Sequence, residues 1–178
     1  LKNFNKKKLI KSLKISCDLE EMDLSVFNIK RNFFLDGKFR VEGNFLDKDK
    51  SKVFWDFENG ILYSKDFLIN NINAKGRIEE QKFRNTLSIN SRSLELKSDL
   101  LYDFSKDIPS TTFLANINRW DLNKLGFKFG NNKQEFKGII SSNLKGKKLN
   151  DLEGEIKISS FSISNKDNTV KFNPIVLK

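Results

Sequence analysis

Polar and apolar residues alternate one by one along most of this chain. In the stretch Phe39–Phe45 every second residue is apolar or glycine, and the residues between them are charged or amide side chains. The same period of two recurs around Trp55–Ile61, Phe83–Ile89, Phe113–Ile117 and Ile156–Phe161. Successive side chains of a β-strand point to opposite faces, so the pattern predicts strands with one apolar face. Helix signals are weak, because the chain has only two Ala and many Asn and Ser. We therefore predict an all-β fold.

Composition removes several classes of catalytic site. The chain has no His, which excludes a Ser-His-Asp triad, a Cys-His pair and imidazole metal ligands. Cys17 is the only cysteine, so there is no internal disulfide, CxxC pair or zinc cluster. We expect no enzyme activity, no catalytic residues, no cofactor and no metal site, and we expect Cys17 to be a small buried apolar residue.

The chain has 178 residues and a formal net charge of +10. Its basic residues are scattered, apart from Lys6–Lys8, and no aromatic-plus-basic ribonucleoprotein motif accompanies them. We therefore expect no nucleic acid partner. The charge is compatible with attraction to anionic lipid headgroups. No apolar run approaches the ~20 residues that a membrane-spanning helix needs.

Clusters of Asn, Asp, Glu, Lys and Gly separate the alternating stretches. Asp47–Lys50, Glu79–Lys82, Gly130–Lys133 and Asn165–Asn168 predict hairpin loops between antiparallel strands. A change of phase at Ser159-Ser160 predicts a bulge or tight turn. These signals predict roughly a dozen to fifteen strands of about five to nine residues.

The sequence also contains an internal similarity. Cys17–Phe27 aligns with Ala115–Leu125 at an offset of 98 residues, with matching Asp-Leu pairs at 23–24 and 121–122. Asp56–Ile61 resembles Asp151–Ile156 after small gaps. We predict a basic lead-in over 1–12, a first β-repeat unit over 13–112 and a second, incomplete unit over 113–178. We expect the chain to be a part of a longer protein.

The C-terminal half carries motifs of a known family. Asn143–Lys178 resembles the recurring unit of TamB-type proteins (translocation and assembly module) in the AsmA-like superfamily, through Leu149, Asp151, Leu152, Gly154, Ile156, Ile158 and Phe161. Phe113–Phe127 and Leu100–Pro109 resemble the segments that precede this unit.

The resemblance implies an elongated, strongly curved antiparallel sheet that forms an open trough with an apolar lining. It also implies a periplasmic location in a diderm bacterium, in a protein anchored in the inner membrane by a part of the chain not present here. The implied work is outer-membrane biogenesis, either as a bridge for phospholipids or beside an Omp85-type outer-membrane protein.

A one-sided sheet must cover its apolar face, and in a trough lipid acyl chains would complete that burial. The candidate groove residues are the alternating apolar side chains Phe39, Val41, Phe57, Ile61, Leu87, Ile89, Leu94, Leu96, Phe113, Ile117, Ile156, Ile158, Phe161 and Ile163. Two alternatives remain. The same residues could form the sealed core of a structural β-module, or the groove or a free sheet edge could hold unfolded outer-membrane proteins or assist secretion.

Overall fold

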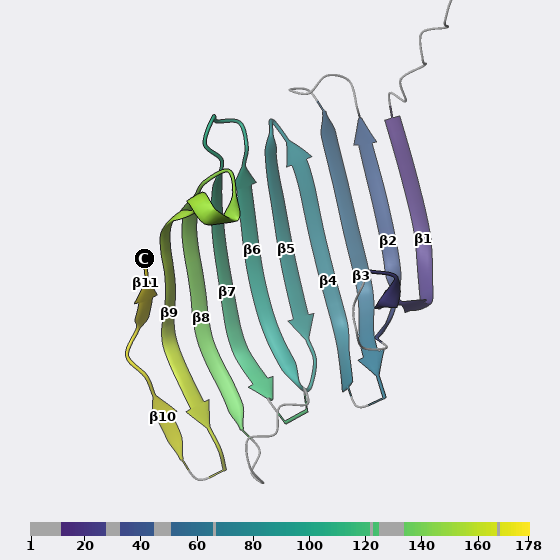
Figure 1. Ribbon diagram of the computed structural model, residues 1–178. Helices are drawn as coiled ribbons and strands as arrows, with labels where there is room; N and C mark the ends of the chain where they lie inside the picture. Colours follow the sequence, from purple (N-terminus) through teal and green to yellow (C-terminus); the bar gives the residue numbers. More distant parts are fainter. Residues whose placement is uncertain are drawn as a thin grey trace, which may run out of the picture.

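The computed structural model describes residues 12–27, 33–44, 51–65, 67–121, 123–124, 134–166 and 168–178. These residues form one open antiparallel sheet of 11 strands in a single layer (Figure 1). The first ten strands follow in chain order, and the last pairs with the ninth. The strands are β1 (Ser12–Asp23), β2 (Phe34–Asn44), β3 (Lys52–Ser64), β4 (Phe67–Glu79), β5 (Lys82–Asn90), β6 (Leu94–Asp103), β7 (Ser110–Asp121), β8 (Glu135–Lys145), β9 (Glu153–Ser164), β10 (Thr169–Lys171) and β11 (Ile175–Leu177).

Two short 3-10 helices accompany the sheet, η1 (Leu24–Phe27) and η2 (Leu149–Asp151). The predicted all-β class is confirmed. The predicted strand lengths were too short, because β1 to β9 have 9 to 13 residues each. The reason is that several phase changes in the sequence are bulges within a strand rather than its end.

The two faces of the sheet differ in chemistry. Directly paired residues of neighbouring strands lie on the same face. One face, called here the apolar face, carries a row of paired residues from β1 to β11 that is apolar at every position except one: Cys17, Phe39, Phe57, Ala74, Leu87, Ser98, Ala115, Ile140, Ile158 and Ile175. The opposite polar face carries a parallel row that starts with Ser16, Arg40, Asp56, Lys75 and Thr86.

A line of bulges crosses the sheet. The pairing register shifts between Leu19 and Met22 in β1 and around Gly37 in β2, and Asn59 in β3 has a φ of 56°. Further along the same line Ser160 in β9 has a φ of 51°, and the β8–β9 register shifts beside it. Bulges bend the strand that carries them and increase its local twist. Ser160 also confirms the irregularity predicted at Ser159-Ser160.

Strands β1–β3 and β7–β9 share a pattern of irregularities. The β1 register shifts between Leu19 and Met22, and the β7 register shifts between Ile117 and Trp120, 98 positions later in both cases. The left-handed residues Asn59 of β3 and Ser160 of β9 occupy comparable places in the third strand of each set. The sequence alignment differs on this point. It sets Asp56–Ile61 against Asp151–Ile156, so Asn59 is aligned with Gly154 and not with Ser160.

Two of the predicted hairpin loops lie between paired strands of the sheet. Glu80 and Gln81 form the two-residue turn between β4 and β5, both with positive φ, which is the type I′ hairpin geometry. Asn165 lies between the paired strands β9 and β10, and its side chain accepts a hydrogen bond from the backbone N–H of Asn168 at 2.8 Å. Asp47–Lys50, Gly130–Lys133 and most of the predicted basic lead-in lie outside the described residues, and Ser12 opens β1.

Candidate functional site

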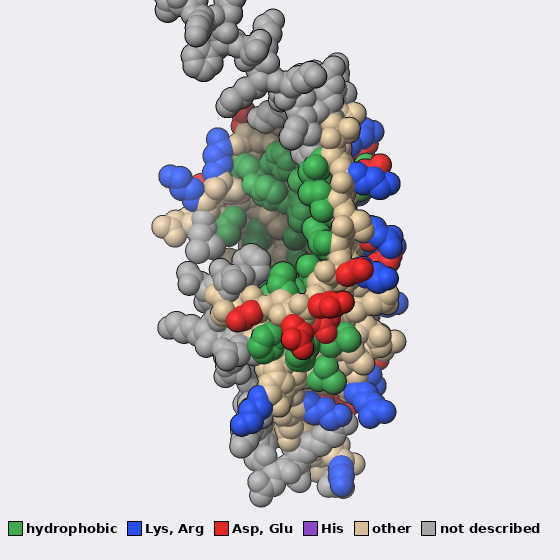
Figure 2. Space-filling model, turned by 90° about the vertical axis from the view of Figure 1, so that its right-hand side faces the viewer, with side chains coloured by type: hydrophobic (Ala, Val, Ile, Leu, Met, Phe, Trp, Pro, Cys, Tyr) green, Lys and Arg blue, Asp and Glu red, His purple; other side chains and the backbone are tan. Residues whose placement is uncertain are grey.

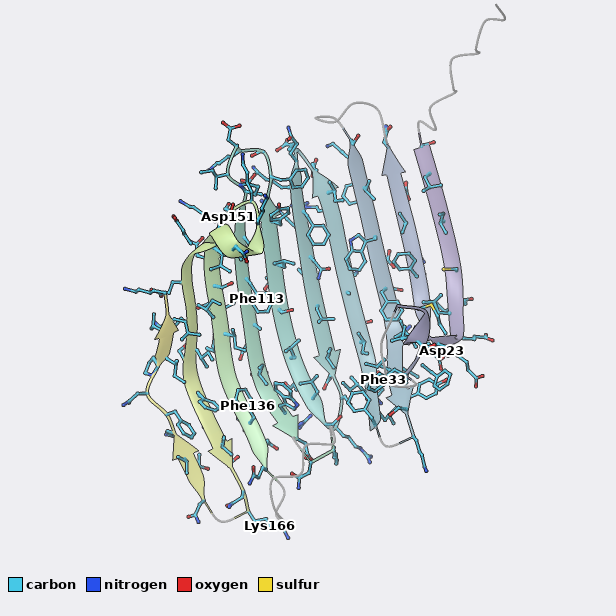
Figure 3. The ribbon with its side chains drawn as sticks, viewed as in Figure 1. Asp23, Phe33, Phe113, Phe136, Asp151 and Lys166 are labelled. Atoms are coloured by element: carbon cyan, nitrogen blue, oxygen red, sulfur yellow. The ribbon has the colours of Figure 1, made fainter. Side chains whose placement is uncertain are left out.

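The apolar face gathers 13 of the 14 predicted groove residues on one side of the sheet. The pairing register places there Phe39, Val41, Phe57, Leu87, Ile89, Leu94, Leu96, Phe113, Ile117, Ile156, Ile158, Phe161 and Ile163. Figure 3 labels two side chains of this face, Phe113 on β7 and Phe136 on β8. The alternation therefore identified one continuous face rather than isolated patches.

Ile61 is the exception, and its predicted place was wrong. The bulge at Asn59 puts Phe57 and Gly60 on the same face, since Phe57 pairs with Ala74 and Gly60 with Ile72. Ile61 then points to the polar face. Tyr63 follows it there, where the ring stacks on Phe34 with centroids 5.6 Å apart.

Two aromatic rings lie flat over glycines on the apolar face. The Phe57 ring covers Gly37 and Gly60, and a Cβ added at either would come within 2.4 Å of it. The Trp55 indole covers Gly76, where an added Cβ would lie 2.1 Å from Nε1. Glycine is required at these positions to leave room for the rings, as in the aromatic rescue of glycine in sheets.

Most of the apolar face is only half-buried. In the described part of the chain the buried apolar side chains are Phe57, Ile69, Ala115 and Ile117, and extensive contacts join only strands that are neighbours in the sheet. Seen from the β1 edge, hydrophobic side chains gather in a hollow on one side of the sheet, and Lys and Arg side chains line the other side (Figure 2). The described residues thus provide no second layer over this face.

Several residues of the apolar face were not among the predicted groove residues. Leu100, Phe136 and Ile140 pair with residues of this face and carry the same period of two. Trp120 packs edge-on against Phe136, with centroids 5.6 Å apart. Cys17 was expected to be buried, but it is partly exposed, because β1 is an edge strand and none of the described residues forms a layer over its apolar side.

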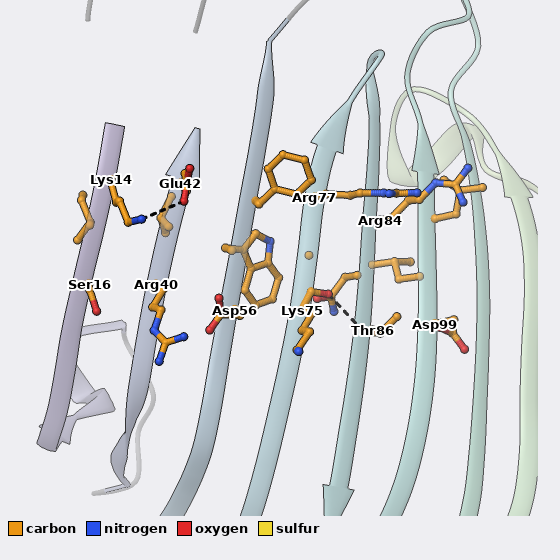
Figure 4. A pocket seen from close by; sticks show the side chains of 18 of the residues that line it. Lys14, Ser16, Arg40, Glu42, Asp56, Lys75, Arg77, Arg84, Thr86 and Asp99 are labelled. Carbon is orange, nitrogen blue, oxygen red and sulfur yellow. Dashed lines mark hydrogen bonds and ion pairs between the residues drawn. The ribbon is translucent and has the colours of Figure 1, made fainter. Parts of the chain in front are cut away.

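The polar face carries a groove of about 830 Å3 that runs across strands β1 to β7 (Figure 4). Its walls include five basic side chains (Lys14, Arg40, Lys75, Arg77 and Arg84), three acidic ones (Glu42, Asp56 and Asp99) and the exposed apolar residues Phe54 and Leu114. Local composition did not predict this cluster, because its members come from strands far apart in the chain.

Ion pairs order part of the polar face. Lys14 Nζ lies 3.4 Å from Glu42 Oε2, and Arg40 lies 3.7 Å from Glu58. Beside the groove, a hydrogen bond from Lys52 lowers the pKa of the Glu79 carboxyl, and the positive charges of Lys52, Arg77 and Arg84 lower it further. The same hydrogen bond and the charge of Glu79 raise the pKa of Lys52.

Neither a metal centre nor a membrane-spanning helix is present in the described ranges. No group of three or more Cys, Asp or Glu side chains is arranged to hold a metal ion there. No helix within the same ranges is long and apolar enough to cross a bilayer. The chain matches no protein-family model, no curated protein and no solved structure. The apolar face, with Trp55 and Phe57 over their glycines, is therefore the candidate functional site on the strength of its own geometry.

Proposed function

We propose that the apolar face binds the acyl chains of phospholipids. The observation that carries this proposal is a wide apolar face left half-exposed in a single-layer sheet. Each methylene of a bound chain removed from water contributes about 0.8 kcal/mol. Bound acyl chains would thus supply the second layer that a one-sided sheet otherwise lacks.

A continuous apolar row suits movement as well as binding. The central row runs from Cys17 in β1 to Ile175 in β11, interrupted only by Ser98. A chain sliding along such a surface exchanges each lost contact for an equivalent new one, so its free energy changes little. We propose that the face acts as a conduit rather than as a closed pocket.

The finer architecture is part of the same proposal. We propose that the sheet curves into an open trough built from units of about 98 residues. The line of bulges supports the curvature, and the matched register shifts of β1 and β7 support the repeat. The resemblance to TamB-type proteins supports a periplasmic segment of an inner-membrane-anchored protein. On that basis it would bridge the two membranes for phospholipid transport, beside an Omp85-type outer-membrane partner.

Native mass spectrometry of the 178-residue chain, purified without delipidating detergent, tests the proposal. We expect phospholipid to co-purify with the chain and its removal to lower the thermal unfolding midpoint, because the apolar face then returns to water. A lipid-free, monodisperse chain whose midpoint does not change when phospholipid is added would contradict the proposal. That result would favour a structural β-module instead.

A further inference from the structure

The groove on the polar face contains two arginines that the acyl-chain proposal leaves unused. Arg77 of β4 and Arg84 of β5 are directly paired across the type I′ hairpin. Figure 4 shows the two side chains at the same level of the sheet. Like charges placed directly opposite each other on antiparallel strands destabilise the pair. The pair of arginines therefore lowers the stability of the sheet unless an anion binds to it.

Two of the other basic side chains of the groove form ion pairs, whereas these two arginines form none with a described carboxylate. Lys14 pairs with Glu42, Arg40 lies beside Glu58, and Asp56 stands between Arg40 and Lys75 in the register. Among the described carboxylates none forms an ion pair with Arg77 or Arg84. Glu79 forms its ion pair with Lys52, which lowers the pKa of its carboxyl most. The positive charges of Arg77 and Arg84 lower the same pKa further without an ion pair.

Apolar side chains flank the arginine pair on both sides. Phe54 of β3 is directly paired with Arg77, and Leu101 of β6 is directly paired with Arg84. Phe54 is 46% exposed, and Leu114 in the neighbouring row is 47% exposed, although both lie on the polar face. Across the four strands the order is therefore apolar, cationic, cationic, apolar.

We propose that Arg77 and Arg84 bind the phosphate head of a single-chain amphiphile whose hydrocarbon chain lies against Leu101 and Leu114. The guanidinium fork matches phosphate oxygens in a bidentate manner, and two such forks match a head with more than one negative charge. The aliphatic stems of the arginines extend the apolar wall. This site is on the opposite side of the sheet from the apolar face, so it does not depend on the acyl-chain proposal.

Calorimetric titration of the 178-residue chain with dodecyl phosphate, below its micelle concentration, tests the site. The double variant Arg77→Gln/Arg84→Gln is expected to weaken binding about tenfold or more, since it removes charge-assisted hydrogen bonds. Its unfolding midpoint without ligand is expected to equal or exceed that of the unmodified chain, because a like-charge pair is lost. This separates lost binding from lost folding.

Two control variants locate the site. Arg92→Gln removes one exposed arginine between β5 and β6, outside the groove lining, and is expected to leave the affinity unchanged. Lys157→Gln removes an exposed cation of β9, also outside the groove lining, and is expected to leave the affinity unchanged as well. Equal affinity in the chain with and without the two arginines would overturn the proposal. So would a loss of affinity in Arg92→Gln as large as in the double variant, or inorganic phosphate binding as tightly as dodecyl phosphate.

Discussion

Gly76→Ala is expected to destabilise the sheet, whereas the same substitution at Gly138 is expected to be tolerated. A Cβ at Gly76 would lie 2.1 Å from Nε1 of Trp55, so the indole would have to leave its place over β4. A Cβ at Gly138 would lie 3.5 Å from the Phe136 ring, which is an ordinary contact. Overpacking of this kind costs about 1–3 kcal/mol, while replacing an unstrained glycine gains about 0.4–1 kcal/mol.

Urea unfolding of the two variants measures this difference. In a Trp120→Phe background, where Trp55 is the only remaining tryptophan, the emission of Gly76→Ala is expected to shift to longer wavelength as the indole becomes more exposed. Equal unfolding midpoints for Gly76→Ala and Gly138→Ala, with unchanged Trp55 emission, would show that the ring does not lie over Gly76.

Paired aspartates on the apolar face are expected to abolish phospholipid binding. Leu87→Asp with Ile158→Asp places two carboxylates in the central apolar row. A carboxylate is too costly to bury without a partner, so it would hold water where the acyl chains are proposed to lie. Both positions are only half-buried, which favours survival of the fold.

The matched control moves each carboxylate by one residue. Ser88→Asp with Ser159→Asp introduces the same charge on the polar face. Each serine directly follows an apolar-face residue in its strand and so points to the opposite side, where Ser88 pairs with Asn73 and Ser159 with Ile139. We expect lipid recovered by extraction to fall by about tenfold or more in the first variant and to stay unchanged in the second. The proposal fails if both variants, shown to be folded by circular dichroism, retain or lose lipid equally.

The fold class could be predicted because the period of two extends over nearly the whole chain. The positions of Leu87, Ile89, Ile156 and Ile158 on one face follow from it directly. Ile61 could not be placed in this way. The bulge at Asn59 inserts a left-handed residue into β3. The run Ile61–Tyr63 is apolar throughout and fits either phase, so the alternation does not show which of its residues face the apolar side. The bulge at Ser160 was visible only because apolar residues on both sides of it change phase.

The open state of the apolar face was beyond prediction from the alternation alone. A sealed sandwich and a single-layer sheet have the same pattern of apolar and polar residues. The pairing of Arg77 with Arg84 could have been read from the hairpin centred on Glu80-Gln81, from which both are equally distant. Their place beside Phe54 and Leu101 required the register of four strands, which depends on loop geometry as well as on sequence.

Quenching of tryptophan by brominated acyl chains tests the central claim most directly. Trp55 lies on the apolar face and Phe54 on the polar face, one residue apart on β3. One variant keeps Trp55 alone (Trp120→Phe), and the other moves the indole across the sheet (Phe54→Trp with Trp55→Phe and Trp120→Phe). We predict that phosphatidylcholine with brominated chains quenches the indole at 55 strongly and the indole at 54 little. Equal quenching at the two positions, or stronger quenching at 54, would contradict acyl-chain binding on the apolar face.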